Sequence, residues 1–207
     1  MLIVATLAAV CSIGQASASE FFPLQEGMKW QYEYTGDSAG TYAQEAGAPV
    51  DLDGKMVTPI LIKNGTKVSS TTFYDVTSAG VYVLGTNPEK LYEKPHPVFQ
   101  IDEKGAKWEF SGPSPYPDDS AAGIAISGTS KLVGLKTILG EKKECLEVKT
   151  TTQIGITKST ATTFEQTSIY AKGIGLAEME ETVRAGKKVI KRKVKLIKFE
   201  GAKAVGG

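Results

Sequence analysis

Alternation of apolar and polar residues is the feature that most restricts the fold of this chain. In the stretch "MKWQYEYT", every second residue from Met28 to Tyr34 is apolar or aromatic, and polar residues separate them. A two-residue period places one set of side chains on each face of a β-strand. Further extended runs are "GVYVLG", "GIAISGTSKLVGLKTIL", "ECLEVKTTTQI", "TATTFEQTSIYA" and "GLAEMEETV". Beyond the N-terminal leader, only Leu24–Gly27 suggests a helical turn.

These runs predict an all-β fold with about ten to twelve mostly antiparallel strands. A strongly bent sheet, a half-barrel and a sandwich all fit the pattern. Asn64-Gly65 predicts a hairpin loop, because both positions of such a turn favour a positive φ. A second hairpin is predicted in "VFQIDEKGAKWEF" with Lys104-Gly105 as its loop. That register would place Ile101 opposite Trp108 and Phe99 opposite Phe110.

The C-terminal run "KKVIKRKVKLIKFE" is strongly basic, although the whole chain has a net charge of only +1. A hairpin over Ala185-Gly186 would place Glu180 opposite Lys191 and Glu178 opposite Lys193. We therefore predict a terminal strand with a charged face rather than a disordered tail. The alternative is contact with an anionic surface, such as lipid headgroups or polysaccharide, through Lys191, Lys193 and Lys195. Near-neutral charge and export argue against nucleic acid as a partner.

The N-terminus has the pattern of a secretory signal. Leu2 to Ile13 is nearly all apolar and too short to span a bilayer, and Ala16-Ser17-Ala18 fits the small-x-small rule for cleavage. We predict a signal peptide over residues 1–18, cleavage near Ala18, and one domain over residues 19–207. The mature protein is then periplasmic or secreted. A lipid anchor at Cys11 is the weaker alternative, because Val10 precedes that cysteine.

Irregular composition predicts two loops, over residues 36–55 and 111–123. The glycines in "YAKGIGLAE" predict a tight turn or bulge between two strands, because the sequence lacks the third glycine and the helix of a nucleotide-binding fingerprint.

Few residues suggest catalysis. The single histidine, His96, lies between two prolines. After cleavage Cys145 is the only cysteine, and we predict that it is buried as a small hydrophobic residue rather than exposed as a reactive thiol, although its alternation with Leu146 argues mildly against deep burial. One histidine and one such cysteine do not make a zinc site. "DLDG" at Asp51–Gly54 and "PDDS" at residues 117–120 are only fragments of a calcium loop. We expect no cofactor, and the alternative enzyme, a hydrolase, would use the 111–123 loop.

Two motifs resemble those of uncharacterised exported bacterial proteins. "FFPLQEGMKWQYEY" resembles their "F/Y-P-L-x-x-G-x-x-W-x-Y" start, and "SIYAKGIGLAEME" resembles a strand-turn-strand near their end. The matching residues are Pro23, Leu24, Gly27, Trp30, Tyr32, Tyr170, Ala171, Gly173, Gly175 and Leu176. The resemblance implies an exported all-β domain without known catalysis. The chain is more loosely similar to the lipoprotein-carrier fold, a curved sheet around an apolar cavity.

The aromatic residues form the candidate ligand-binding surface: Trp30, Tyr32, Tyr34, Trp108 and Phe110. They are expected to form the core or to line a concave surface for an apolar ligand. The sequence thus predicts a non-enzymatic exported or envelope-associated protein that binds an apolar or lipidic ligand or an envelope protein, with peripheral membrane contact as a further hypothesis.

Overall fold

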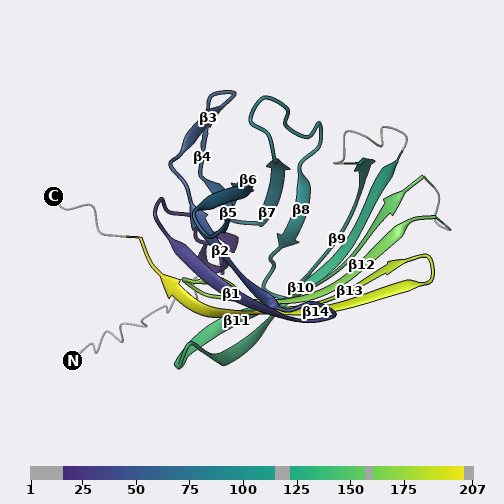
Figure 1. Ribbon diagram of the computed structural model, residues 1–207. Coiled ribbons are helices and arrows are strands. Elements are labelled where there is room, and N and C mark those ends of the chain that lie inside the picture. The colour runs from purple at the N-terminus through teal and green to yellow at the C-terminus, as the bar shows by residue number, and fades with distance from the viewer. Residues whose placement is uncertain (1–15, 115–121, 157–159, 203–207) are drawn as a thin grey trace, which may run out of the picture.

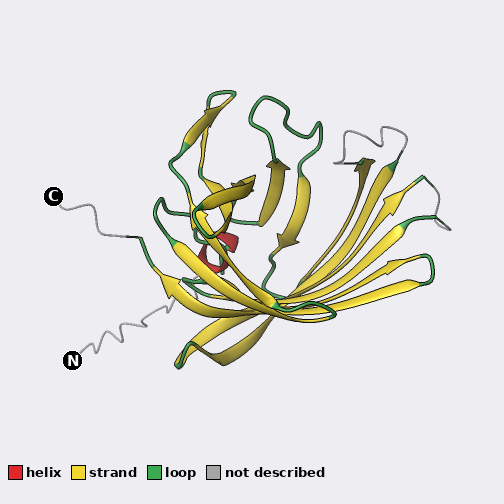
Figure 2. Ribbon diagram, in the orientation of Figure 1, coloured by secondary structure: helices red, strands yellow, loops and turns green. Residues whose placement is uncertain are grey.

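The computed structural model describes residues 16–114, 122–156 and 160–202, and almost all of the ordered elements are strands (Figures 1 and 2). One sheet of twelve antiparallel strands has the order β8-β7-β6-β5-β2-β1-β14-β13-β12-β11-β10-β9, and β3 and β4 form a small second sheet. The elements are α1 (Ala18–Phe21), β1 (Lys29–Gly36), β2 (Gly40–Ala46), β3 (Val50–Leu52), β4 (Lys55–Val57), β5 (Pro59–Asn64), β6 (Lys67–Val76), β7 (Gly80–Gly85), β8 (His96–Gln100), β9 (Ala106–Pro113), β10 (Gly123–Ile138), β11 (Glu141–Gly155), β12 (Thr162–Ala171), β13 (Gly175–Ala185) and β14 (Lys188–Glu200).

The sheet is bent into a half-closed shell (Figure 1). Its two edge strands, β8 and β9, are neighbours in sequence, and they approach each other where residues 101–105 join them. The Ser130 hydroxyl on β10 donates a hydrogen bond to the Gln100 carbonyl at this corner. The predicted hairpin with Ile101 opposite Trp108 is therefore wrong, because β8 pairs with β7 and β9 pairs with β10.

The predicted alternation in β1 is confirmed. Trp30 and Tyr32 are buried, Tyr34 is half-buried, and the intervening residues are exposed. The buried donors of this strand are satisfied across the core: the Trp30 indole N–H donates to the Ile174 carbonyl at 2.6 Å, and the Tyr32 hydroxyl donates to the Leu176 carbonyl at 3.0 Å. These bonds connect β1 to the turn between β12 and β13 and to the start of β13.

The basic C-terminal run forms β14, which lies between β13 and β1 inside the sheet. The predicted hairpin with β13 exists, but Ala185 pairs with Lys188, so Glu180 faces Lys193 and Glu178 faces Lys195. The loop is therefore Gly186-Lys187, one residue later than predicted. Partners move by two positions, which keeps every side chain on its expected face.

Three other sequence predictions need correction. Asn64 pairs with Lys67, so the β5–β6 loop is Gly65-Thr66, and only Gly65 has a positive φ. Residues 36–55 contain β2, β3 and the start of β4 rather than one loop. The helical turn lies at Ala18–Phe21 and not at Leu24–Gly27. The predicted turn at Gly173 and Gly175 is confirmed, since both glycines have a positive φ between β12 and β13.

Two large apolar clusters fill the closed part of the shell. The first surrounds Trp30 and Tyr32, and the second joins α1 to β7, β8 and β11 through Phe21, Val81, Phe99 and Leu146. A third, smaller cluster holds the β3–β4 sheet against Phe73. The shell is thus a packed core at one end and not an empty container.

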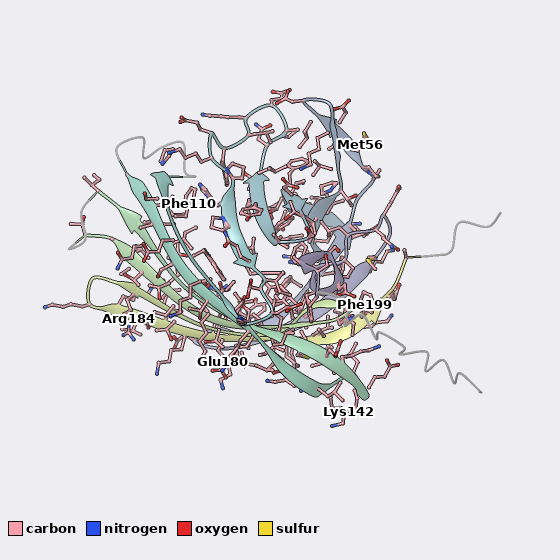
Figure 3. All side chains as sticks on the ribbon, turned by 180° about the vertical axis from the view of Figure 1, so that it is seen from behind. Met56, Phe110, Lys142, Glu180, Arg184 and Phe199 are labelled. Atoms are coloured by element: carbon pink, nitrogen blue, oxygen red, sulfur yellow. The ribbon has the colours of Figure 1, made fainter. Side chains whose placement is uncertain are left out.

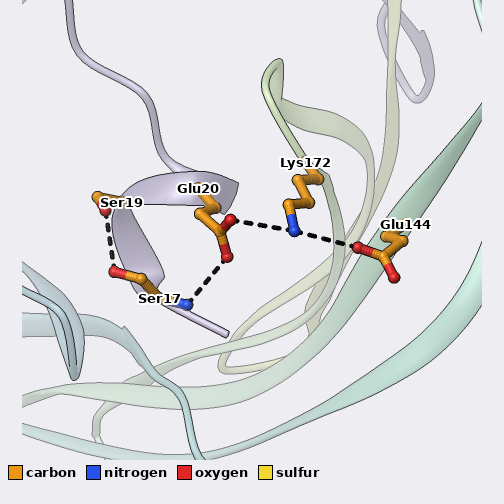
Figure 4. Close-up of polar contacts among 5 residues, drawn as sticks. All are labelled: Ser17, Ser19, Glu20, Glu144 and Lys172. Atoms are coloured by element: carbon orange, nitrogen blue, oxygen red, sulfur yellow. Dashed lines mark hydrogen bonds and ion pairs between the residues drawn. The ribbon is translucent and has the colours of Figure 1, made fainter. Parts of the chain in front are cut away.

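The short helix α1 is fixed to the core by both ends (Figure 4). Ala18 and Phe21 are almost fully buried, and the Ala18 N–H donates to the Ser78 carbonyl at 2.9 Å. Glu20 accepts a hydrogen bond from the Ser17 N–H and forms an ion pair at 3.0 Å with Lys172. The Lys172 ammonium also lies 3.2 Å from a carboxylate oxygen of Glu144, so a single lysine links α1 to β11.

Candidate functional site

The concave face has a closed half and an open half. Strands β5–β8 and α1 cover the closed half. Strands β9–β14 extend beyond this cover at one end, where their terminal residues are 113, 123, 155, 162, 185 and 188 (Figure 1). In the open half, successive strands place their inward side chains in transverse rows, because the strands pair in register. We call two adjacent rows the apolar row and the polar row.

The apolar row crosses six strands. Its members pair in direct succession from β9 to β14: Phe110, Ile126, Thr152, Phe164, Val183 and Ile190. Ile126 is buried, but the other five are only half-buried. Half-exposed Phe, Val and Ile side chains on a concave face form a surface that a second apolar body could cover.

The polar row lies one inward position deeper on the same strands, and its members also pair in succession: Trp108, Gly128, Thr150, Gln166, Glu181 and Arg192. Gly128 is required here, because a Cβ atom at that position would lie 2.2 Å from the indole ring of Trp108. Six neighbouring strands span about 24 Å from the first to the last, given a spacing near 4.8 Å.

Two donors in the polar row are poorly satisfied. Trp108 is 6% exposed, and its indole nitrogen has no hydrogen-bond partner within the described residues. The Gln166 amide nitrogen donates to the Met179 sulfur, which is a weak acceptor. A buried donor without a good acceptor destabilises the free protein by about 1–3 kcal/mol. An acceptor group in this row would recover part of that free energy.

The charged end of the polar row is partly neutralised. Arg192 lies 3.4 Å from the Glu181 carboxylate. Tyr42 lies close to both charges and stacks on Tyr32 at a centroid distance of 5.1 Å. Burial raises the pKa of Tyr42 to about 12, so its phenol stays protonated and can donate a hydrogen bond at neutral pH. The row therefore offers neutral donors along its length and a paired cation at one end.

The five candidate ligand-binding residues fall into two groups. Trp30 and Tyr32 are packed in the closed core and have no face free for a ligand, while Tyr34 is half-buried beside Tyr42. Trp108 and Phe110 both lie on β9, in the polar and the apolar row. The other row members were missed, because rows across strands depend on long-range register.

The three candidate lysines for an anionic surface lie on β14. Lys193 forms an ion pair at 2.7 Å with Glu180, and Lys195 faces Glu178. Lys191 faces Thr182, and its backbone N–H donates to the Asp37 carboxylate. Alternating acids and lysines on neighbouring strands give this outer face a mixed charge (Figure 3, near Glu180).

The structure does not bring His96 and Cys145 together. His96 is buried at the β8–β9 seam, where its ring stacks on Tyr92 at 4.4 Å and meets Phe110 at 5.0 Å. Burial lowers the pKa of this histidine. Cys145 is fully buried in the cluster around Trp30, which confirms the prediction of a buried cysteine, whereas the argument from its alternation with Leu146 is wrong. Apolar clusters cover both faces of β11 at Cys145 and Leu146, and burial raises the pKa of the Cys145 thiol.

Two other candidate sites gain no supporting geometry. Within the described residues, no three His, Cys, Asp or Glu side chains gather as metal ligands would. Asp51 serves its own turn instead, because its carboxylate accepts the Gly54 N–H at 2.7 Å. Much of the 111–123 loop, with the "PDDS" fragment, lies outside the described residues. In the part of the chain that the structure describes, no helix has the length and apolar character needed to cross a membrane.

Comparisons with known proteins give little guidance. No family model matches the sequence, and no curated protein matches it significantly. One similar solved structure is a candidate lipoprotein from Parabacteroides distasonis, with a TM-score of 0.47 and 10% identity over 87% of this chain and 98% of that one. Another is a candidate exported protein with a YmcC-like fold from Bacteroides fragilis, with a TM-score of 0.43 and 12% identity over 86% and 97%. Neither likeness is strong enough to support a conclusion about this chain.

Proposed function

We propose that this chain is an exported, non-enzymatic binding protein that holds an elongated amphiphile on the open half of its concave face. The export part rests on the signal-like pattern of residues 1–18. The binding part rests on one observation, the largely half-exposed apolar row that runs in register beside the polar row.

The chemistry of the ligand follows from the two rows. The apolar row fits an acyl or similar hydrocarbon body, because its half-buried side chains lose water contact when they are covered. The polar row fits a hydrogen-bond acceptor such as an ester or carboxylate, because Trp108 and Gln166 have donors without good acceptors. Both rows extend about 24 Å, which matches a long chain lying across the strands.

A lipid could alternatively be held inside an enclosed cavity, but the apolar hollow in the closed half is too small for one. The small apolar hollow between Phe22, Trp30 and Tyr32 has a volume of only about 20 Å³, and aromatic side chains fill the space around it. A ligand pocket of ordinary size has a volume of at least about 300 Å³. The amphiphile would therefore lie on the open half, in contact with both solvent and protein.

A pair of substitutions on one strand tests this function. Val183 belongs to the apolar row, and its neighbour Thr182 points to the opposite face, across from Lys191. Val183→Asp should weaken binding of a fluorescent fatty acid at least about tenfold, since it places a charge against the hydrocarbon. Thr182→Asp should leave binding unchanged. Absence of fatty-acid binding by the wild-type chain, or equal losses in both variants, would falsify the proposed function.

A further inference from the structure

The tip of the β10–β11 hairpin displays leucine side chains to solvent. Leu135 is 64% exposed, Leu139 is 46% exposed and Leu132 is 44% exposed. The hairpin projects below the rest of the sheet in Figure 1, away from the open half, and Lys142 marks its tip in Figure 3. Three leucines on one projecting hairpin are a surface that folding alone does not explain.

The turn itself is strained by one of these leucines. Ile138 pairs with Glu141, so Leu139-Gly140 is a two-residue loop, and both residues have a positive φ, 48° and 86°. Turns of this kind favour Asn, Asp or Gly at the first position, because a larger side chain disfavours the left-handed region. A leucine held there at the tip is a local conflict that points to a role outside folding.

Cations lie beside the leucines. The hairpin from Lys131 to Glu144 holds four lysines and two glutamates. Lys143 pairs with Glu141 at 2.8 Å, Glu144 pairs with Lys172, and Lys131 pairs with Glu147. Among the described residues, Lys136 and Lys142 form no ion pair. The tip therefore combines exposed aliphatic side chains with unneutralised positive charge.

We propose that this hairpin tip docks on an anionic lipid surface. Leu135 and Leu139 enter the boundary between headgroups and acyl chains, and Lys136 and Lys142 contact the anionic headgroups. Aliphatic residues flanked by lysines are the composition of an interfacial membrane anchor. The contact is separate from the ligand surface, because the two rows cross β10 and β11 near their opposite ends. It therefore does not depend on amphiphile binding.

Vesicle co-sedimentation of the full chain tests this docking. Vesicles that contain phosphatidylglycerol should bind the protein, and vesicles of phosphatidylcholine alone should bind it much more weakly. The double variant Leu135→Gln/Leu139→Asn should bind at least about tenfold more weakly, because two apolar insertions are lost. Lys136→Gln and Lys142→Gln should each weaken binding about fivefold at low salt.

Matched variants separate membrane contact from folding. Asn is favoured at a positive φ, so Leu139→Asn should keep or raise the melting temperature while it weakens binding. Met56→Gln and Val189→Gln remove exposed apolar side chains elsewhere and should bind vesicles as the wild type does. Docking on anionic lipid is overturned by equal binding to both vesicle types, by unchanged binding of the double variant, or by binding to envelope proteins without binding to vesicles.

Discussion

The closed and open halves of the concave face are built from the same alternating strands, yet only one of them is a core. In the closed half, Trp30 and Tyr32 are buried under β5–β8 and α1, and their polar atoms are hydrogen-bonded. In the open half, Phe164 and Val183 point inward in the same way but are only half-buried. Alternation therefore makes an apolar face, and the covering layer decides whether that face becomes core or binding surface.

The largest expected difference between the two halves comes from truncating one aromatic side chain in each of them. Trp30→Ala should lower the free energy of unfolding by about 3–5 kcal/mol, because it leaves a cavity and deprives the Ile174 carbonyl of its donor. Phe164→Ala should cost only about 1 kcal/mol, since its side chain is already half-exposed. Denaturant unfolding followed by circular dichroism measures both. Similar losses would show that the open half is also packed, which would remove the reason to regard it as a binding surface.

The sequence predicted the strands better than their arrangement. The runs that became β1, β7 and β10–β13 were all recognised, because a buried face imposes a two-residue period on each strand separately. The β13–β14 hairpin was also found, since Ala185 and Gly186 lie between two strands of opposite charge. Its loop was misplaced by one residue because the predicted and the observed register both set Glu180 and Glu178 opposite lysines and keep every side chain on the same face.

Features that depend on distant partners were missed. The residues around Lys104-Gly105 satisfy every local rule for a hairpin, but β8 and β9 instead diverge and pair with β7 and β10. Alternation places Cys145 and Leu146 on opposite faces, and both are fully buried because a different apolar cluster covers each face. The polar row has no local signal at all, because Thr150, Gln166 and Glu181 become neighbours only when three strands pair in register.

Removal of Ala18 and the residues before it should give the next largest effect, since α1 covers the closed half. A chain that begins at Ser19 lacks the buried Ala18. It also lacks the Ser17 N–H, which donates a hydrogen bond to the Glu20 carboxylate. It should be less stable than a chain that begins at Gln15, by about 1–2 kcal/mol. Signal cleavage after Ala18 would produce the shorter chain. Equal denaturation midpoints for the two chains would show that the N-terminal residues are not part of the cover.

The smallest effect is expected at the seam where the two halves meet, and it depends on pH. His96 is the only histidine, and it is held as a neutral ring between Tyr92 and Phe110, with its pKa lowered by burial. Above the unfolded-state pKa, near 6.5, His96 is neutral in both the folded and the unfolded state. In that range its titration therefore adds no pH dependence to the stability. As the pH falls below that value, the unfolded state binds the proton more readily, and the folded state loses stability.

The melting temperature should therefore fall between pH 7.5 and pH 5.5, by less than about 3 °C from this residue alone. His96→Phe keeps an aromatic ring at the seam but cannot titrate, so the wild type minus variant difference isolates the histidine. That difference should be constant above about pH 7 and should decrease as the pH falls. A difference that stays constant over the whole range would mean that His96 is as accessible to protons in the folded chain as in the unfolded one. The seam would then be open to water, and the covered half would end at β7 rather than at β8.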